Sequence, residues 1–195
     1  MIVIVAPGQG SQTPGFLEPW LDLEGAREQL GAISDAVGID LVAHGTTSDA
    51  DTIRDTKVAQ PLIVAAGLLT LSSLFADGRR EKVGGVAGHS VGEVTAAAAA
   101  GILSDTDAVA FVRERGRAMA DAAALEPTGM SAVLGGDEAA LLERLAELDL
   151  FPANFNGGGQ VVISGAAKAV AAACEAAKAA GAKRALPLPV SAPFH

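Results

Sequence analysis

Cysteine, aromatic residues and positive charge are all scarce in this sequence. The single cysteine, Cys174, excludes an intrachain disulfide framework. Aromatic residues make up 4% of the chain, which favours helices packed through small side chains over a ligand site caged by rings. Fourteen Lys and Arg residues against 23 Asp and Glu residues give a net charge of −9. A surface that negative argues against general nucleic-acid binding.

Targeting and membrane segments are not indicated either. The first ten residues, MIVIVAPGQG, are apolar but lack a basic n-region, so they predict a buried first strand and not a signal peptide. The alanine-rich stretch 94–103 is far too short to span a bilayer. Half of the residues are apolar, which is enough for a folded core, and we expect a cytoplasmic protein without membrane contact.

The apolar pattern predicts an α/β fold in which a small subdomain is inserted into a larger one. Strands at 2–6 and 83–87 belong to a parallel-sheet subdomain over residues 1–126. The order strand–helix–strand–strand–helix–strand then predicts a ferredoxin-like subdomain over residues 127–190, and residues 191–195 would return to the larger one. The other expected elements are helices at 58–75, 94–100 and 105–124, and small-subdomain elements at 130–134, 137–148, 151–155, 160–164, 166–180 and 183–190.

Ser90 has the sequence context of a catalytic nucleophile. Gly88-His89-Ser90-Val91-Gly92 fits the pattern G-x-S-x-G and stands between a predicted strand and a predicted helix, as a nucleophile elbow requires. With the parallel strands, this elbow predicts that the subdomain at 1–126 is the N-terminal part of an α/β-hydrolase-like subdomain, incomplete in this chain. The two glycines leave room for a strained turn that lifts the hydroxyl clear of the sheet. The helix would direct its positive dipole end at the serine oxygen, with the Val91 N–H as an oxyanion donor. A glycine-flanked serine in an ordinary turn is the alternative.

A second glycine-rich loop, Gly8-Gln9-Gly10-Ser11-Gln12, follows the first strand. It does not fit a phosphate-binding loop, because no Gly-Lys-Ser/Thr follows and Thr13 stands where a dinucleotide fingerprint needs its third glycine. An α/β-hydrolase-type site needs a second oxyanion donor from another strand-end loop, and a backbone N–H near Gln9 is the candidate. A plain strand-end turn is the alternative.

Arg115 lies on an apolar face of the helix predicted at 105–124. Its neighbours at i±3 and i±4, which define this inward face, are Phe111, Val112, Ala118 and Met119. By contrast, Arg117 lies on a charged, solvated face. An arginine on an apolar face needs an anionic partner, because an unpaired buried charge is costly. The partner is a protein carboxylate or a substrate carboxylate, and the residues alone leave both open.

A serine nucleophile needs a base, and the chain offers three histidines. His44 is expected in a surface loop. His89 should point away from Ser90, because adjacent side chains on an elbow diverge. His195 follows the small subdomain, where the chain would return to the larger one, and is the candidate base. Met119 and Met130 are expected only to fill the core.

Four features together resemble the malonyl-CoA:acyl carrier protein transacylase family. They are the loop at 8–12, the stretch 88–93 (GHSVGE), the Arg115-Gly116 step, and the ending Pro193-Phe194-His195. The stretches 154–156 and 160–162 also resemble the family, and the likeness runs the whole length of the chain. It implies an enzyme without cofactor or metal that moves a malonyl group from malonyl-CoA to the phosphopantetheine thiol of an acyl carrier protein, for fatty acid or polyketide synthesis.

The same resemblance implies a role for each matched position in the catalytic centre. Ser90 would be the acylated nucleophile and His195 its base. Arg115 would hold the malonyl carboxylate, and the backbone N–H groups of Gln9 and Val91 would form the oxyanion hole.

Three further positions are implied to contact the substrate. Gln160 and Arg184 would lie near the coenzyme A moiety. Phe194, beside the base, would crowd an α-methyl group, so malonyl is favoured over methylmalonyl as the substrate.

Members of this family continue well past the histidine. We therefore expect the 195-residue chain alone to be poorly stable and nearly inactive, with the remaining segment as a partner if it is supplied as a second chain. The start at Met1 favours a free-standing protein over a polyketide synthase domain. Two other functions stay open: a serine thioesterase or hydrolase on the same elbow, and an inactive, truncated acyltransferase scaffold that only docks a carrier protein.

Overall fold

The computed structural model describes residues 1–179, 181–188 and 194–195, and the chain divides into two compact units. The first unit is Met1–Ala120 and the second is Asp121–His195. Each contains a hydrophobic core of its own. The subdomain limits set from the sequence at 126/127 and 190/191 stay predictions, and the second of them falls on residues outside the described ones.

The first unit packs helices against a two-stranded parallel sheet. β1 (Ile2–Ala6) pairs with β2 (Val83–Gly88), and Ile4 lies opposite Val86. The α-helices are α1 (Ala26–Val37), α2 (Leu41–Thr46), α3 (Thr56–Phe75), α4 (Gly92–Ala99) and α5 (Asp105–Ala123), joined in part by the 3-10 helices η1 (Glu18–Trp20), η2 (Thr52–Arg54) and η3 (Ala76–Lys82). The strands and the helices α3, α4 and α5 confirm the predicted elements to within two residues, whereas α1 and α2 were not predicted.

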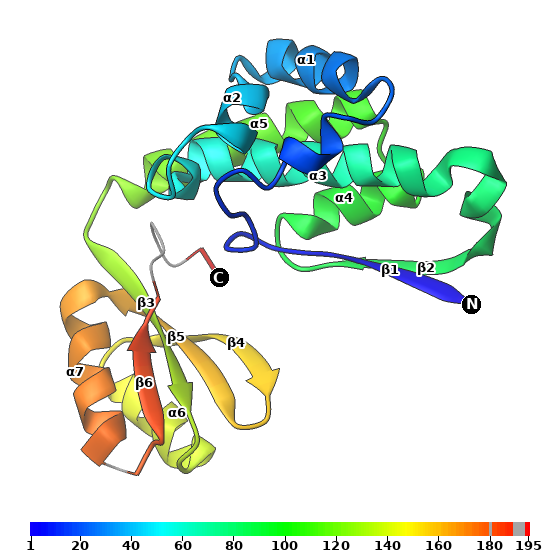
Figure 1. Ribbon diagram of the computed structural model, residues 1–195. Helices are drawn as coiled ribbons and strands as arrows, with labels where there is room; N and C mark the ends of the chain where they lie inside the picture. The colour runs from blue at the N-terminus through cyan, green and yellow to red at the C-terminus, as the bar shows by residue number, and fades with distance from the viewer. Residues whose placement is uncertain (180, 189–193) are drawn as a thin grey trace. The chain divides into compact units, whose positions relative to one another are not determined.

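One face of this strand pair is covered and the other is open. The helices of the unit lie on one side of the pair, and Ile4 and Val86 pack into the core there (Figure 1). On the opposite face Val3 is 53% and Val5 is 71% exposed. The prediction of a buried first strand is therefore wrong for these side chains, because the described helices cover only the Ile4 face.

Helix α3 is the centre of the first core. Eleven of its residues are buried, among them Leu62, Val64 and Leu68. By length and composition α3 could cross a membrane, but 56% of its apolar window is buried inside the protein. This burial is typical of the central helix of a folded unit, and we interpret α3 in that way.

The second unit is a four-stranded antiparallel sheet with order β4-β5-β3-β6. Its elements are β3 (Thr128–Leu134), α6 (Glu138–Glu147), β4 (Phe151–Gly157), β5 (Gln160–Ala166), α7 (Ala167–Ala179) and β6 (Arg184–Pro187). Both helices pack on one face of the sheet, where Leu145 and Val170 meet Val133 and Ile163 (Figure 1). This strand order confirms the predicted ferredoxin-like arrangement. The predicted end of the last strand, at 189–190, lies outside the described residues.

Candidate active site

Ser90 occupies a strained turn between β2 and α4. Its φ is 54°, a left-handed conformation that is uncommon for a residue with a side chain. The glycines on either side make this turn possible. A Cβ at Gly88 would overlap the backbone of Gly92, and a Cβ at Gly92 would overlap the carbonyl oxygen of Ala6. The strand–turn–helix context required for a nucleophile elbow is thus present.

Helix α4 begins directly behind the serine. The Ser90 carbonyl accepts a hydrogen bond from the Glu93 N–H at 3.0 Å, and the Val91 carbonyl accepts one from the Val94 N–H at 3.1 Å. Val91 is the N-cap residue of α4, so its N–H belongs to the end of the helix where amide groups lack intrahelical acceptors. A negative charge on the Ser90 acyl group would be stabilised at such a helix end.

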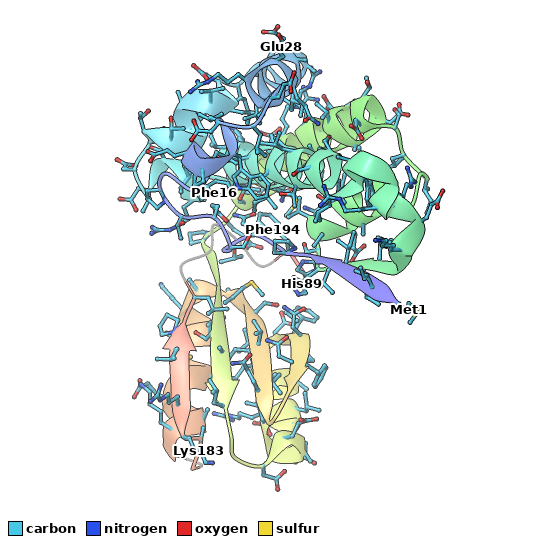
Figure 2. All side chains as sticks on the ribbon, turned by 45° about the vertical axis from the view of Figure 1, so that its right-hand side comes forward. Met1, Phe16, Glu28, His89, Lys183 and Phe194 are labelled. Carbon is cyan, nitrogen blue, oxygen red and sulfur yellow. The ribbon has the colours of Figure 1, made fainter. Side chains whose placement is uncertain are left out.

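The loop after β1 and the elbow after β2 both leave the sheet at the carboxyl ends of its parallel strands. The His89 N–H donates to the Ala6 carbonyl at 3.1 Å, which continues the strand pairing to the start of both loops. Gly8 lies against His89: a Cβ there would be 2.6 Å from His89 Nδ1. Figure 2 shows His89 and Met1 at opposite ends of the strand pair, as parallel strands require.

Side chains of this loop anchor it to η2 and α3. Gln9 Nε2 donates to the Arg54 carbonyl at 3.3 Å and to Thr56 Oγ1 at 3.4 Å. Gln12 Nε2 donates to the Ile53 carbonyl at 3.0 Å. The backbone at Gln9 is therefore held beside the elbow, where the predicted second oxyanion donor would have to lie.

Arg115 reaches the candidate nucleophile. Its Nη2 donates to Ser90 Oγ at 3.1 Å, and its Nη1 donates to Gln60 Oε1 at 2.5 Å. The side chain is half-buried, and burial lowers the pKa of Arg115, while the charge of Glu93 acts in the opposite direction. Among the described residues, no carboxylate lies within ion-pair distance of the guanidinium. The sequence left two possible partners for Arg115, a protein carboxylate and a substrate carboxylate. The described part of the chain provides no protein carboxylate.

The face of α5 around Arg115 differs from the predicted one. The buried residues are Ala108, Val109, Val112 and Gly116. Phe111 is 55% exposed and Ala118 is exposed as well, so their expected place on the inward face is wrong. Arg115 lies at the border of the buried stripe, which is how its stem is covered while its guanidinium reaches the site.

Gln60 belongs to the candidate site although it was not predicted from the sequence. It lies on α3 and is only 1% exposed, and besides accepting from Arg115 it donates from Nε2 to Met119 Sδ at 2.9 Å. Gly116 lets the two helices approach, because a Cβ there would be 3.3 Å from the Thr56 carbonyl oxygen. The sequence did contain a signal for Gln60, because its amide stands inside the apolar stretch Val58–Leu69. A buried amide needs hydrogen-bond partners, so its presence there indicates a polar contact in the core.

The remaining predicted site residues lie in the second unit. The His195 carbonyl accepts a hydrogen bond from Ser164 Oγ at 3.3 Å, and Ser164 is buried. Gln160 and Arg184 each pair with Leu134, on opposite sides of it, so both side chains project from the same face of the sheet. Phe194 is half-buried. The pairing of His195 with Ser90 would join the two units and stays a prediction.

The other two histidines, His44 and His89, both belong to the first unit. His44 lies within α2, half-buried, with Nδ1 3.0 Å from Ser48 Oγ, so the predicted surface loop is wrong. The cause is the cap that Asp40 provides for the Ala43 N–H, which starts a short helix before His44. His89 is exposed and follows β2.

Known proteins resemble this chain along its whole length. Residues 3–195 match a family described as the acyl transferase domain. A malonyl CoA-acyl carrier protein transacylase from Mycobacterium tuberculosis (strain ATCC 25618 / H37Rv) is 52% identical over 199 residues, which cover 100% of this chain and 64% of that protein. A protein of the same name from Escherichia coli (strain K12) is 39% identical over 199 residues, covering 98% and 63%. The chain thus spans just under two thirds of the length of these relatives.

Solved structures are similar over the same span. The crystal structure of MCAT from Mycobacterium tuberculosis has a TM-score of 0.94 at 51% identity and covers 100% of this chain and 64% of its own. A type II PKS acyl-carrier protein in complex with its malonyl-transacylase, PlMCAT:AntF, gives a TM-score of 0.86 at 36% identity, covering 98% and 63%. These similarities confirm the α/β fold class predicted from the sequence.

Proposed function

The chain belongs to the acyl transferase domain family, and from that premise we propose that it transfers a malonyl group from malonyl-CoA to the phosphopantetheine thiol of an acyl carrier protein, through an ester on Ser90. One observation carries the proposal: Arg115 Nη2 lies 3.1 Å from Ser90 Oγ, and no carboxylate of the described residues pairs with it. A guanidinium in this place suits an acyl group that ends in a carboxylate, because it can bind two oxygens at once.

The first half-reaction forms the ester. His195 takes the proton of Ser90, and Ser90 Oγ attacks the thioester carbonyl carbon of malonyl-CoA. The N–H groups of Gln9 and Val91 stabilise the oxyanion. The C–S bond then breaks, and coenzyme A leaves as the thiol with the proton from His195.

The second half-reaction reverses these steps with another thiol. The phosphopantetheine sulfur of the carrier protein loses its proton to His195 and attacks the malonyl-serine ester. The Ser90 oxygen leaves and regains the proton. Arg115 contributes to both halves, because it binds the free carboxylate and so fixes the acyl group for each attack.

Arg115 also supports the choice of Ser90 as nucleophile. A guanidinium only donates hydrogen bonds, so Ser90 Oγ accepts from it and donates its own proton elsewhere. The positive charge beside Oγ favours the negative charge that develops there when the proton leaves. In the second unit, the proposed roles are base for His195, contacts with the coenzyme A moiety for Gln160 and Arg184, and exclusion of an α-methyl group for Phe194.

The proposed acceptor is a carrier protein of fatty acid or polyketide synthesis, and the proposed location of the reaction is the cytoplasm. Lys183 and Arg184 at the start of β6 support an acidic partner, because the chain as a whole carries a net charge of −9 and needs a local basic surface to bind one.

The experiment is intact-protein mass spectrometry of the protein, Ser90→Ala and Arg115→Ala after incubation with malonyl-CoA. Because the 195-residue chain is expected to turn over very slowly, the incubation is long enough to detect a single acylation of Ser90. We expect a malonyl adduct on Ser90, none in Ser90→Ala, and a loss of about a hundredfold or more in the adduct rate for Arg115→Ala, since a charge-assisted contact to the reacting group is removed. Transfer from acetyl-CoA, which has no free carboxylate, serves as the control. A hydrolase would keep its turnover of neutral esters in Arg115→Ala and pass the acyl group to water, and labelling away from Ser90 would end the proposal.

A further inference from the structure

The Gln60 side chain is buried with both ends of its amide engaged. Oε1 accepts from Arg115 Nη1 at 2.5 Å, and Nε2 donates to Met119 Sδ at 2.9 Å. A primary amide is nearly symmetric in shape, but one end only accepts hydrogen bonds and the other only donates them. Rotating the amide by half a turn would therefore exchange acceptor and donor without changing the space it fills.

The two partners of Gln60 decide between these orientations. The guanidinium of Arg115 is donor-only, so a donor N–H facing it would be repelled. The thioether sulfur of Met119 only accepts, so the carbonyl end facing it would gain nothing. Only the observed orientation satisfies both contacts: Arg115 binds the carbonyl end, and the sulfur of Met119 gives the buried donor end its acceptor.

The helices place these groups with little freedom. Met119 follows Arg115 by one turn on α5, so both side chains lie on the same side of that helix. Gln60 faces them from α3, and Gly116 between them allows the close approach of the two helices. Arg115 Nη2 then reaches Ser90 Oγ at 3.1 Å. Met119, Gln60, Arg115 and Ser90 thus form one continuous series of contacts.

We propose that Met119 is a positioning residue for substrate selection, whose sulfur fixes the amide of Gln60 and thereby holds Arg115 ready for a carboxylate-bearing acyl group. This inference rests on the proposed function, because it assigns Arg115 to the malonyl carboxylate. Without the sulfur, the buried Nε2 loses its acceptor, and the Gln60 side chain is favoured to turn toward another acceptor and so leave Arg115. Arg115 would then sample positions away from Ser90, and only substrates with a carboxylate would lose binding.

The test compares Met119→Leu with the unchanged protein in steady-state transfer from malonyl-CoA and from acetyl-CoA. Leucine keeps the apolar volume and removes the acceptor. We expect KM for malonyl-CoA to rise roughly threefold to tenfold, the effect of losing one hydrogen bond, with kcat/KM for acetyl-CoA unchanged. Met130→Leu is the matched control, since it makes the same change at a buried methionine of the second unit and should alter neither substrate.

A second background shows whether the sulfur acts through the amide. In Gln60→Leu there is no amide to orient, so adding Met119→Leu should leave the malonyl KM where Gln60→Leu alone puts it. A loss of equal size in both backgrounds, or an equal loss for malonyl-CoA and acetyl-CoA, would overturn the inference. So would Met119→Leu behaving like Met130→Leu. If the unchanged protein forms no malonyl ester, or Arg115→Ala keeps its preference for malonyl-CoA, the proposed function itself is wrong and the inference falls with it.

Discussion

At the scale of single residues, Ser90 combines a reactive position with an unfavourable backbone conformation. An L-residue in the left-handed region loses about 1–2 kcal/mol relative to the right-handed one, because Cβ crowds the backbone. At Ser90 the φ of 54° directs the side chain out of the turn to the Arg115 guanidinium. The conformational cost is therefore tied to presenting the hydroxyl.

This cost can be measured with two variants that both lack the hydroxyl. Ser90→Ala keeps Cβ and its strain, whereas Ser90→Gly removes both. We expect Ser90→Gly to have a free energy of unfolding about 1 kcal/mol higher than Ser90→Ala in urea denaturation, although neither variant can form the ester. Equal stabilities, or a less stable Ser90→Gly, would show that the turn carries no strain of this kind.

At the scale of elements, the elbow depends on how closely α4 approaches β1. Gly92 in the first turn of α4 lies against the Ala6 carbonyl, and no side chain fits between them. The approach places the beginning of α4 over the ends of both strands. Packing at this contact, and not the helix itself, sets where Ser90 and the Val91 N–H stand.

Gly92→Ala tests that contact. Because the new Cβ meets backbone and not a flexible side chain, we expect a loss of about 3 kcal/mol or more in the free energy of unfolding. Gly31→Ala is the matched control: it lies inside α1 with nothing within 4 Å of the added Cβ, and it should gain about 0.5–1 kcal/mol. Thermal or urea unfolding gives both values, and a Gly92→Ala variant as stable as Gly31→Ala would contradict this account.

The elbow and most of the helices and strands could be predicted from the sequence, because their signals lie in neighbouring residues. The G-x-S-x-G spacing between an apolar run and a helix indicated the elbow, and apolar periodicity located α3, α5 and the ferredoxin-like sheet. Gln60 could not be assigned in this way, since its partners Arg115 and Met119 are 55 and 59 positions away and meet it only through the packing of α3 on α5. The face of α5 was misjudged at Phe111 for the same reason: periodicity gives the spacing of a buried stripe, while the neighbouring helix decides where it lies.

At the scale of the whole molecule, the two units differ in how completely they cover their sheets. In the second unit, the residues Met130, Ala132 and Val162 remain buried on the face away from α6 and α7. In the first unit, the parallel pair β1–β2 presents Val3, Val5 and Ala87 on an exposed face. We call these three residues the open apolar face. Parallel strands are usually covered on both sides, so this surface is unusually apolar for one in contact with water.

The open apolar face should dominate binding of an apolar dye. We expect the 195-residue chain to enhance the fluorescence of anilinonaphthalene sulfonate, and Val5→Lys, at the centre of the face, to reduce the enhancement strongly. Because Val5 is already 71% exposed, the free energy of unfolding should stay within about 0.5 kcal/mol. Ile102→Lys places the same charge at a residue that is 77% exposed but lies outside this face, and it should leave the dye signal nearly unchanged. A loss of signal in both variants would mean that the dye responds to net charge. The open apolar face would then not be the main site of dye binding.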